Sequence, residues 1–237
     1  MWKELSDLVM PRTCLVCGNP LGARENHLCI WCAAHLPLTY YWERPHNPMA
    51  DEFNAVLERH RKSGERLDYA YAAALLLYHH ENPYKRIPQA LKYRHNVSAG
   101  RYFSARLGRC LASFPHWADV DVVVPVPLHW LRRWRRGYNQ AQVIAAELAN
   151  ALGARLCPDA LQRVRRTRSQ TSLSAEERLS NVSSVFAVRC LPRARHILLV
   201  DDTFTTGATL AACHRVLREA LGGGVRISVA TLSVVDG

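Results

Sequence analysis

The 237-residue chain lacks the features of membrane-spanning and exported proteins. It contains no run of about 18 apolar residues, the length that a membrane-spanning helix requires. Its first residues, MWKELSDLVMPRTC, show neither the continuous apolar stretch nor the small-residue cleavage site of a signal peptide. Internal repeats and low-complexity segments are also missing. These absences argue against membrane insertion and repeat architectures, and we expect a globular, cytoplasmic protein.

Acidic residues are the scarcer of the two charged classes. The chain has 31 Lys and Arg against 20 Asp and Glu, which gives a formal net charge of +11. An excess of this size favours polyanionic partners such as nucleic acid or phosphorylated small molecules. Composition alone leaves a second interpretation open, namely a basic surface that contacts only solvent.

Apolar runs alternate with amphipathic segments from residue 69 onward. The predicted strands are residues 70–80, 119–127, 196–200 and 225–235. The predicted helices are residues 83–95, 97–112, 138–152 and 207–221, with shorter ones at 51–62 and, from a capping-box pattern, after 174. This alternation predicts an α/β fold with a mostly parallel sheet and helices on both of its faces.

Four of the eight cysteines are crowded near the N-terminus as two CxxC pairs. Two such pairs supply four thiolates, and each pair can hold one side of a tetrahedral zinc ion. We therefore predict a closed, structural zinc site, with free thiols or disulfides as the alternatives. The predicted ligands are Cys14, Cys17, Cys29 and Cys32.

Residues 197–210 read ILLVDDTFTTGATL, a buried strand followed by two carboxylates, a Thr/Gly turn and a helix. The start of a helix after such a turn favours phosphate binding, because backbone N–H groups and the helix dipole face the anion. Asp201 and Asp202 would repel a bare phosphate, but they can accept hydrogen bonds from sugar hydroxyls or hold a divalent cation. A sugar phosphate satisfies both halves of the motif, whereas an isolated Asp-Asp pair would indicate only an ordinary loop with an N-cap.

The same stretch resembles the 5-phosphoribosyl pyrophosphate (PRPP) signature of type I phosphoribosyltransferases. The resemblance implies that Asp201 and Asp202 hold the ribose hydroxyls, and that magnesium accompanies the pyrophosphate. It further implies that the 5′-phosphate is bound by the turn, which consists of Thr205, Thr206, Gly207, Ala208 and Thr209. The two aspartates are also our candidate catalytic residues.

Three further blocks narrow the resemblance to the ComF/GntX family. They are LKYR at 91–94, PVPLHWLRRWRRGYNQA at 125–141 and RTRSQTSLSAEERLSNVSSVF at 166–186. The chain departs from the family pattern at 94–96, where members often carry a glycine. The resemblance covers nearly the whole chain except 37–68, and it implies a zinc ribbon at 1–36 and a phosphoribosyltransferase-like domain at 69–237. Residues 37–68 are polar and interrupted by prolines, which predicts a linker or peripheral segment.

Basic residues are concentrated in two of these blocks. Pyrophosphate suits arginine forks, but the first block has more cations than one pyrophosphate uses. Its tryptophans either stack single-stranded bases or pack beneath the loop. The second block is the expected place of a mobile loop that closes over PRPP. The predicted pyrophosphate or DNA contacts are Lys92, Arg132, Arg133, Arg135, Arg136 and Gln170.

Two functions compete at this point. The first is an enzyme that transfers phosphoribosyl from PRPP to an acceptor and releases pyrophosphate. The second is a non-catalytic module that senses PRPP or a nucleotide and binds single-stranded DNA. The family resemblance links either function to natural transformation and the DNA-uptake machinery. The acceptor is not indicated by any motif in the chain.

Overall fold

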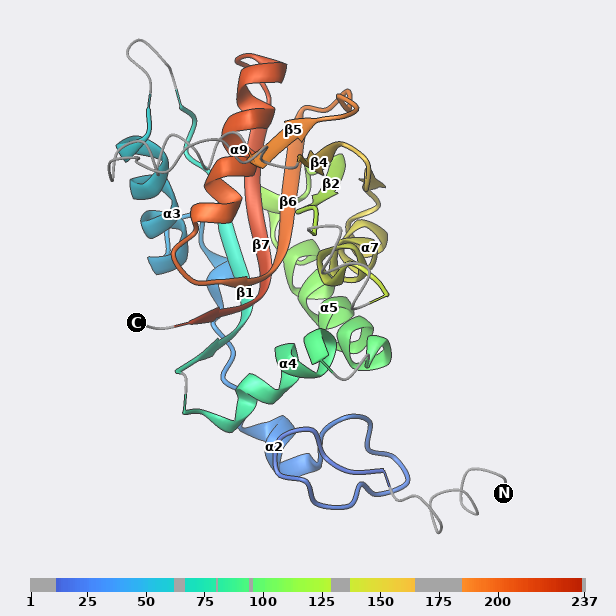
Figure 1. Ribbon diagram of the computed structural model, residues 1–237. Coiled ribbons are helices and arrows are strands. Elements are labelled where there is room, and N and C mark those ends of the chain that lie inside the picture. Colours follow the sequence, from blue (N-terminus) through green and yellow to red (C-terminus); the bar gives the residue numbers. More distant parts are fainter. Residues whose placement is uncertain are drawn as a thin grey trace, which may run out of the picture.

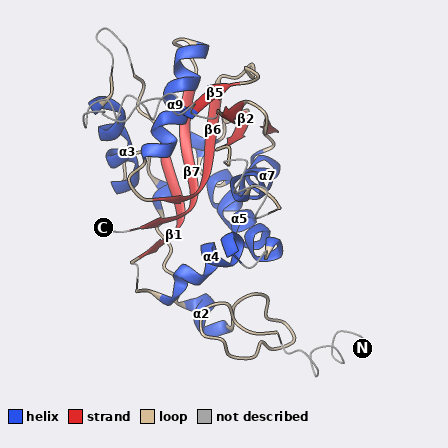
Figure 2. Ribbon diagram, viewed as in Figure 1, coloured by secondary structure: helices blue, strands red, loops and turns tan. Residues whose placement is uncertain are grey.

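A five-stranded parallel sheet forms the centre of the described structure, a computed structural model of residues 12–61, 67–79, 81–93, 96–128, 137–164 and 185–235. The strand order is β1-β7-β6-β2-β3, and every neighbouring pair runs parallel. The strands are β1 (Ala72–Tyr78), β2 (Val122–Pro125), β3 (Arg155–Leu156), β6 (His196–Phe204) and β7 (Arg226–Val235). The predicted α/β fold with a parallel sheet is therefore confirmed (Figure 2).

Helices cover both faces of this sheet (Figure 1). On one face α4 (Arg86–Tyr93), α5 (Val97–Ala112) and α7 (Gln140–Leu152) share a hydrophobic cluster with the sheet. On the other face α3 (Pro48–Arg59) and α9 (Ala208–Leu221) share a second cluster. The shorter elements are α2 (Ile30–Ala34), η1 (Tyr41–Glu43), η2 (Pro83–Lys85), η3 (Pro115–Trp117) and an antiparallel hairpin of β4 (Leu161–Arg163) and β5 (Phe186–Val188).

The two aspartates lie on the central strand β6, toward its carboxyl end. Its first half is continuously apolar and buried from Ile197 to Val200, as a strand covered by helices on both faces requires. The predicted strand ended at Val200, but pairing with β7 continues to Phe204. Asp201 and Asp202 therefore lie within the strand and not in the loop after it.

The connections between strands leave in two directions. From β2, α7 leads outward to β3, whereas from β6, α9 leads the other way to β7. The two helices lie mainly on opposite faces, so neighbouring strands β6 and β2 flank a switch point of the topology. In open α/β sheets this point, at the carboxyl ends of the strands, is the usual place for a ligand.

The segment that we expected to be a linker or peripheral contributes buried side chains to both clusters. Leu38 forms a bridge with Leu76 of β1, and Trp42 is buried and accepts a hydrogen bond at its carbonyl from Trp117 Nε1 (3.0 Å). Helix α3 packs Phe53 fully buried beside α9. The helical spacing of apolar residues from 49 to 57 explains this packing, although prolines and charges around it suggested an exposed segment.

Several sequence predictions fall outside the described residues. They concern the basic loop 129–136, the segment 165–184 with its capping box, and residues 94–95. The strands β3, β4 and β5 were not predicted, because two or three residues carry no readable periodicity. Among the described helices, none combines the length and apolar character needed to cross a membrane.

Candidate functional site

A cleft of about 480 Å³ opens at the carboxyl ends of the parallel strands. It lies at the switch point, since Val126 and Pro127 continue from β2 on one side and Asp201 and Asp202 lie in the last part of β6 on the other. Helix α4 contributes further wall residues, including Gln89 and Lys92. The cleft thus brings together the aspartates and two of the loop threonines, which were predicted to bind PRPP, with Lys92, which was predicted to contact pyrophosphate or DNA.

Asp202 is held by a cation from α4. Lys92 Nζ lies 3.0 Å from Asp202 Oδ1 and donates to Thr203 Oγ1 at 3.2 Å. Both side chains of the ion pair are largely shielded from solvent, at 23% exposed for Lys92 and 16% for Asp202. The lysine therefore compensates one of the two negative charges that sequence analysis placed side by side.

Asp201 has a different environment. Its Oδ1 accepts a hydrogen bond from the backbone N–H of Asp202 (2.8 Å), which favours the ionised form. Burial opposes ionisation more strongly, and with the neighbouring Asp202 carboxylate it raises the pKa of Asp201 to about 7. Lys92 and Arg163 moderate this rise. The pair therefore combines a carboxylate beside a lysine with a carboxyl group that titrates near neutrality.

The turn after β6 leads directly into the start of helix α9. Thr203–Leu210, with Asp201, line a small hollow of about 40 Å³ at the start of α9. The N-cap of α9 is Gly207, and no side chain caps this helix end. Its φ of +68° lies in the left-handed region, and an added Cβ would meet Phe204 ring atoms at 2.9 Å. Glycine is therefore required here both by the backbone conformation and by the contact with Phe204.

The start of α7 closes the side of the cleft near β2. Asn139 caps this helix by accepting from the Ala141 N–H (3.2 Å), and its Nδ2 donates to the Val126 carbonyl (3.0 Å). These bonds fix the end of β2 to the beginning of α7. Asn139, Gln140 and Ala141 all line the cleft, so helix α7 begins at the cleft wall.

Some residues of the cleft wall were not predicted from the sequence. Arg163, the last residue of β4, lines the cleft and lies with its guanidinium 5.4 Å from the Phe186 ring centre. It was not among the predicted contacts, since the short hairpin that carries it has no clear signature in the sequence. Tyr78 and Val235, at the ends of β1 and β7, could have been found from the rule that ligands lie at carboxyl strand ends.

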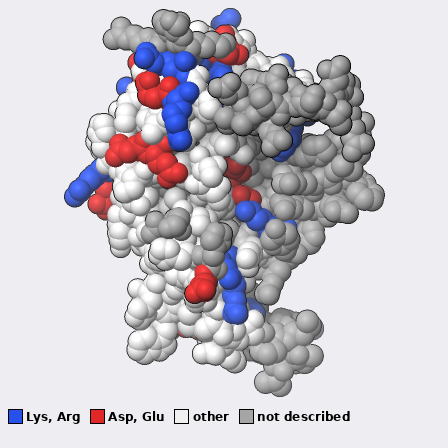
Figure 3. Space-filling view, turned by 60° about the vertical axis from the view of Figure 1, so that its left-hand side comes forward, with Lys and Arg blue, Asp and Glu red and all other residues white. Residues whose placement is uncertain are grey.

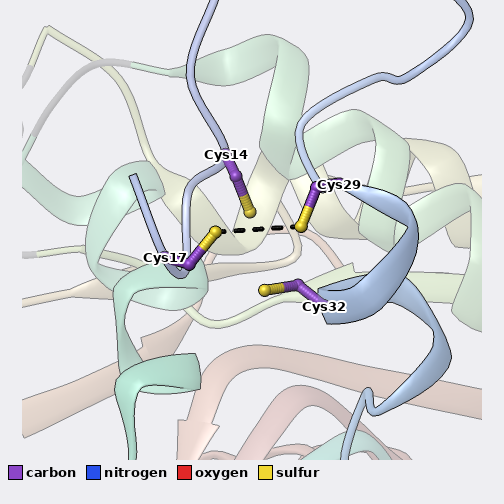
Figure 4. A group of neighbouring side chains, drawn as sticks. All are labelled: Cys14, Cys17, Cys29 and Cys32. Atoms are coloured by element: carbon purple, nitrogen blue, oxygen red, sulfur yellow. Dashed lines mark hydrogen bonds between the residues drawn. The ribbon is translucent and has the colours of Figure 1, made fainter. Parts of the chain in front are cut away.

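The four predicted zinc ligands come together (Figure 4). Their sulfur atoms all lie within 4.8 Å of one another, and Cys17 and Cys29 are 3.7 Å apart. Tetrahedral zinc with Zn–S bonds of about 2.3 Å places sulfurs about 3.8 Å apart, so the cluster fits this ion. Burial opposes ionisation of Cys14, but backbone N–H groups of Cys17, Cys29 and Val16 lower the pKa of its thiol to about 6.

The cysteine cluster lies beside α4, at the end of the molecule toward which the strands point (Figure 1). Cys14, Val16 and Leu28 belong to the same hydrophobic cluster as Ile87 and Leu91 of α4. The Cys-rich segment is thus packed against a helix that also lines the cleft.

The residues of the two predicted basic loops lie outside the described part of the chain. Arg132, Arg133, Arg135, Arg136 and Gln170 are all in this group, and their roles stay predictions. On the face drawn in Figure 3, acidic and basic side chains of the described residues lie interspersed.

The chain is similar in sequence to known proteins that carry two different names. The chain is 26% identical to competence protein F of Haemophilus influenzae over 212 residues, which cover 87% of this chain and 90% of that protein. It is 37% identical to DNA utilization protein YhgH of Escherichia coli K12 over 97 residues. That match spans 41% of this chain and 43% of YhgH, and the Salmonella typhi protein of the same name is 38% identical over the same length. No protein-family model matches the chain.

Proposed function

We propose that this chain, as a member of the ComF family, binds PRPP at the cleft and acts in DNA uptake. The observation that carries the proposal is the meeting of three unlike groups at one switch point. These are a carboxylate pair, an anion cradle at a helix start, and a lysine that pairs with one of the two carboxylates. PRPP combines ribose hydroxyls, a 5′-phosphate and a pyrophosphate, which these groups match in turn.

The ribose would lie over the end of β6. Its hydroxyls donate hydrogen bonds to Asp201 and Asp202, while the 5′-phosphate accepts from backbone N–H groups of the Thr205–Thr209 turn. The hollow at the start of α9 adjoins the aspartates in sequence and in space. The carboxylate pair therefore binds the ribose hydroxyls and the turn binds the phosphate, so the carboxylates do not have to contact the phosphate.

The pyrophosphate would lie toward α4. Lys92 contacts Asp202 in the structure, and a pyrophosphate oxygen offers this ammonium group a second, more highly charged partner. The arginines of 132–136 and Gln170 are proposed to complete this side. Magnesium, when bound, would neutralise part of the pyrophosphate charge, with the acidic pair nearby as hydrogen-bonding support.

Transfer would be a displacement at C1′ of the ribose. The lone pair of an acceptor forms the new bond at C1′, and the bonding pair of the broken C1′–O bond leaves with pyrophosphate. Because Asp201 has a pKa of about 7, it is suited to take the proton that the acceptor loses. The remaining contribution of the protein is positioning and stabilisation of charge.

The link to DNA rests on the relatives. Competence protein F and DNA utilization protein YhgH carry these roles in their names. We propose that this chain serves the same process, with single-stranded DNA bound by the Arg/Trp loop at 129–136. DNA binding can be tested separately from PRPP binding, because contacts to the DNA phosphates make the affinity for DNA fall steeply with salt concentration.

Calorimetric titration tests the PRPP proposal. We expect saturable binding of PRPP with magnesium by the full chain, lost in Asp201→Asn/Asp202→Asn. Asp159→Asn is the matched control, since this exposed aspartate pairs with Arg189 away from the cleft. Equal PRPP binding by the double variant and the wild type would refute the assignment of the aspartates. If PRPP binds as expected, pyrophosphate release in the presence of a panel of amines and nucleobases would identify the acceptor.

A further inference from the structure

Helix α4 is contacted at its two ends by different parts of the protein. At its C-terminal end Lys92 contacts Asp202 in the cleft (3.0 Å). At its N-terminal end Arg86 Nη1 donates to the Val16 carbonyl at 2.6 Å. In the turn just before, the Tyr84 hydroxyl donates to the Cys32 carbonyl at 3.0 Å. One short helix therefore spans the distance from the Cys-rich segment to the candidate PRPP site.

The two acceptor carbonyls are parts of the cysteine knuckles. Val16 lies between Cys14 and Cys17, and Cys32 is itself one of the four clustered cysteines. Their positions depend on whether the four sulfurs are held together. A segment this short has little core of its own, so an ion bound by the thiolates would supply much of its order.

Packing strengthens the connection between the two parts. Leu91 of α4 is fully buried, and it lies in one hydrophobic cluster with Cys29 and Leu28 of the Cys-rich segment. The Leu91 carbonyl also accepts a hydrogen bond from Tyr138 OH, just before α7. An eight-residue helix is marginal by itself, since isolated helices need about 12–15 residues in water. The position of α4 is therefore set by these neighbours.

We propose that Tyr84 and Arg86 are positioning residues that couple the cysteine cluster to the cleft. Metal held by the four thiolates fixes the Val16 and Cys32 carbonyls, these fix α4 through Arg86 and Tyr84, and α4 holds Lys92 against Asp202. The consequence for PRPP rests on the proposed function. The coupling itself can be measured without any ligand.

Hydrogen exchange on the full-length chain tests the coupling directly. We expect metal removal by a chelator to raise the exchange of backbone amides in α4 about tenfold or more, with little change in α9. Arg86→Met and Tyr84→Phe should produce the same local rise while metal analysis shows the cysteine cluster still loaded. Arg109→Met is the matched control, because Arg109 is exposed on α5 and donates no hydrogen bond to the Cys-rich residues that the structure describes.

Two outcomes of this measurement would overturn the proposal. One is an unchanged exchange rate in α4 after metal release and in both variants. The other is a rise of equal size in α4 and α9, which would indicate general loosening and not a directed coupling.

A double-mutant cycle extends the test to the ligand. We expect Arg86→Met to weaken PRPP binding about fivefold or more in the wild-type background. In a Lys92→Met background the same change should cost no further affinity, because it acts through Lys92. Equal losses in both backgrounds contradict the proposed route. Absence of PRPP binding by the wild type would refute the proposed function, while the exchange measurement would still decide the coupling.

Discussion

Replacement of Gly207 by alanine should weaken the fold and the anion cradle together. An alanine at φ +68° costs about 1–2 kcal/mol of backbone strain. Its Cβ would lie 2.9 Å from two ring atoms of Phe204, which is buried and packs edge-on against Phe53. Such crowding typically costs about 1–3 kcal/mol. The lower entropy of the unfolded alanine variant offsets about 0.4–1 kcal/mol of this cost, so the net destabilisation should be about 1–5 kcal/mol, with the middle of the ranges near 3 kcal/mol.

Urea denaturation of three alanine variants separates these contributions. Gly153 has φ +64° and open space around it, so Gly153→Ala reports the backbone strain alone. Gly223 has neither a positive φ nor a close neighbour, so Gly223→Ala should change the free energy of unfolding by about 0.5 kcal/mol or less. The expected order of destabilisation is Gly207, then Gly153, then Gly223. The reasoning fails if Gly207→Ala is no more destabilising than Gly153→Ala.

Three further predictions concern charge and metal. The raised pKa of Asp201 means that the folded chain keeps a proton which the unfolded chain releases between the ordinary carboxyl pKa and about 7. The free energy of unfolding should therefore fall as pH rises through this window. Asp201→Asn should reduce the difference between the free energies of unfolding measured in urea at about pH 5 and pH 8. An unaltered difference would contradict the raised pKa of Asp201. Lys92→Met should destabilise by about 1–3 kcal/mol because Asp202 keeps a shielded carboxylate without its cation, whereas Arg189→Met, which breaks an exposed pair with Asp159, should cost about 0–1 kcal/mol; equal costs would show that shielding does not matter. Elemental analysis should find one zinc per chain, and chelation should lower the thermal midpoint; a chain that is equally stable without bound metal would argue against a structural site.

Long, strongly patterned elements were readable from the sequence. The apolar run before Asp201 predicted a central strand, and the residues from 207 to 221 predicted the helix after it. The CxxC spacing predicted a cluster that the structure shows with sulfurs within 4.8 Å. In each case local chemistry and the final environment agree, which is the condition under which pattern alone suffices.

Tertiary contacts account for what the sequence did not reveal. The pairing of Phe204 with Val234 extends β6 through the aspartates, although Asp is a poor strand former. The ion pair between Lys92 and Asp202 joins residues far apart in the chain, so no spacing rule could predict it. The same holds for Arg86 and Val16, whose contact depends on how the Cys-rich segment docks.

A crystal structure of the chain with PRPP and magnesium tests the central claim most directly. We expect to find the 5′-phosphate in the cradle formed by the Thr205–Thr209 turn, with the ribose hydroxyls on Asp201 and Asp202. We also expect Lys92 turned from Asp202 toward the pyrophosphate. Ligand density anywhere other than the carboxyl ends of β6 and β2 would contradict the account, as would a ribose without contact to either aspartate.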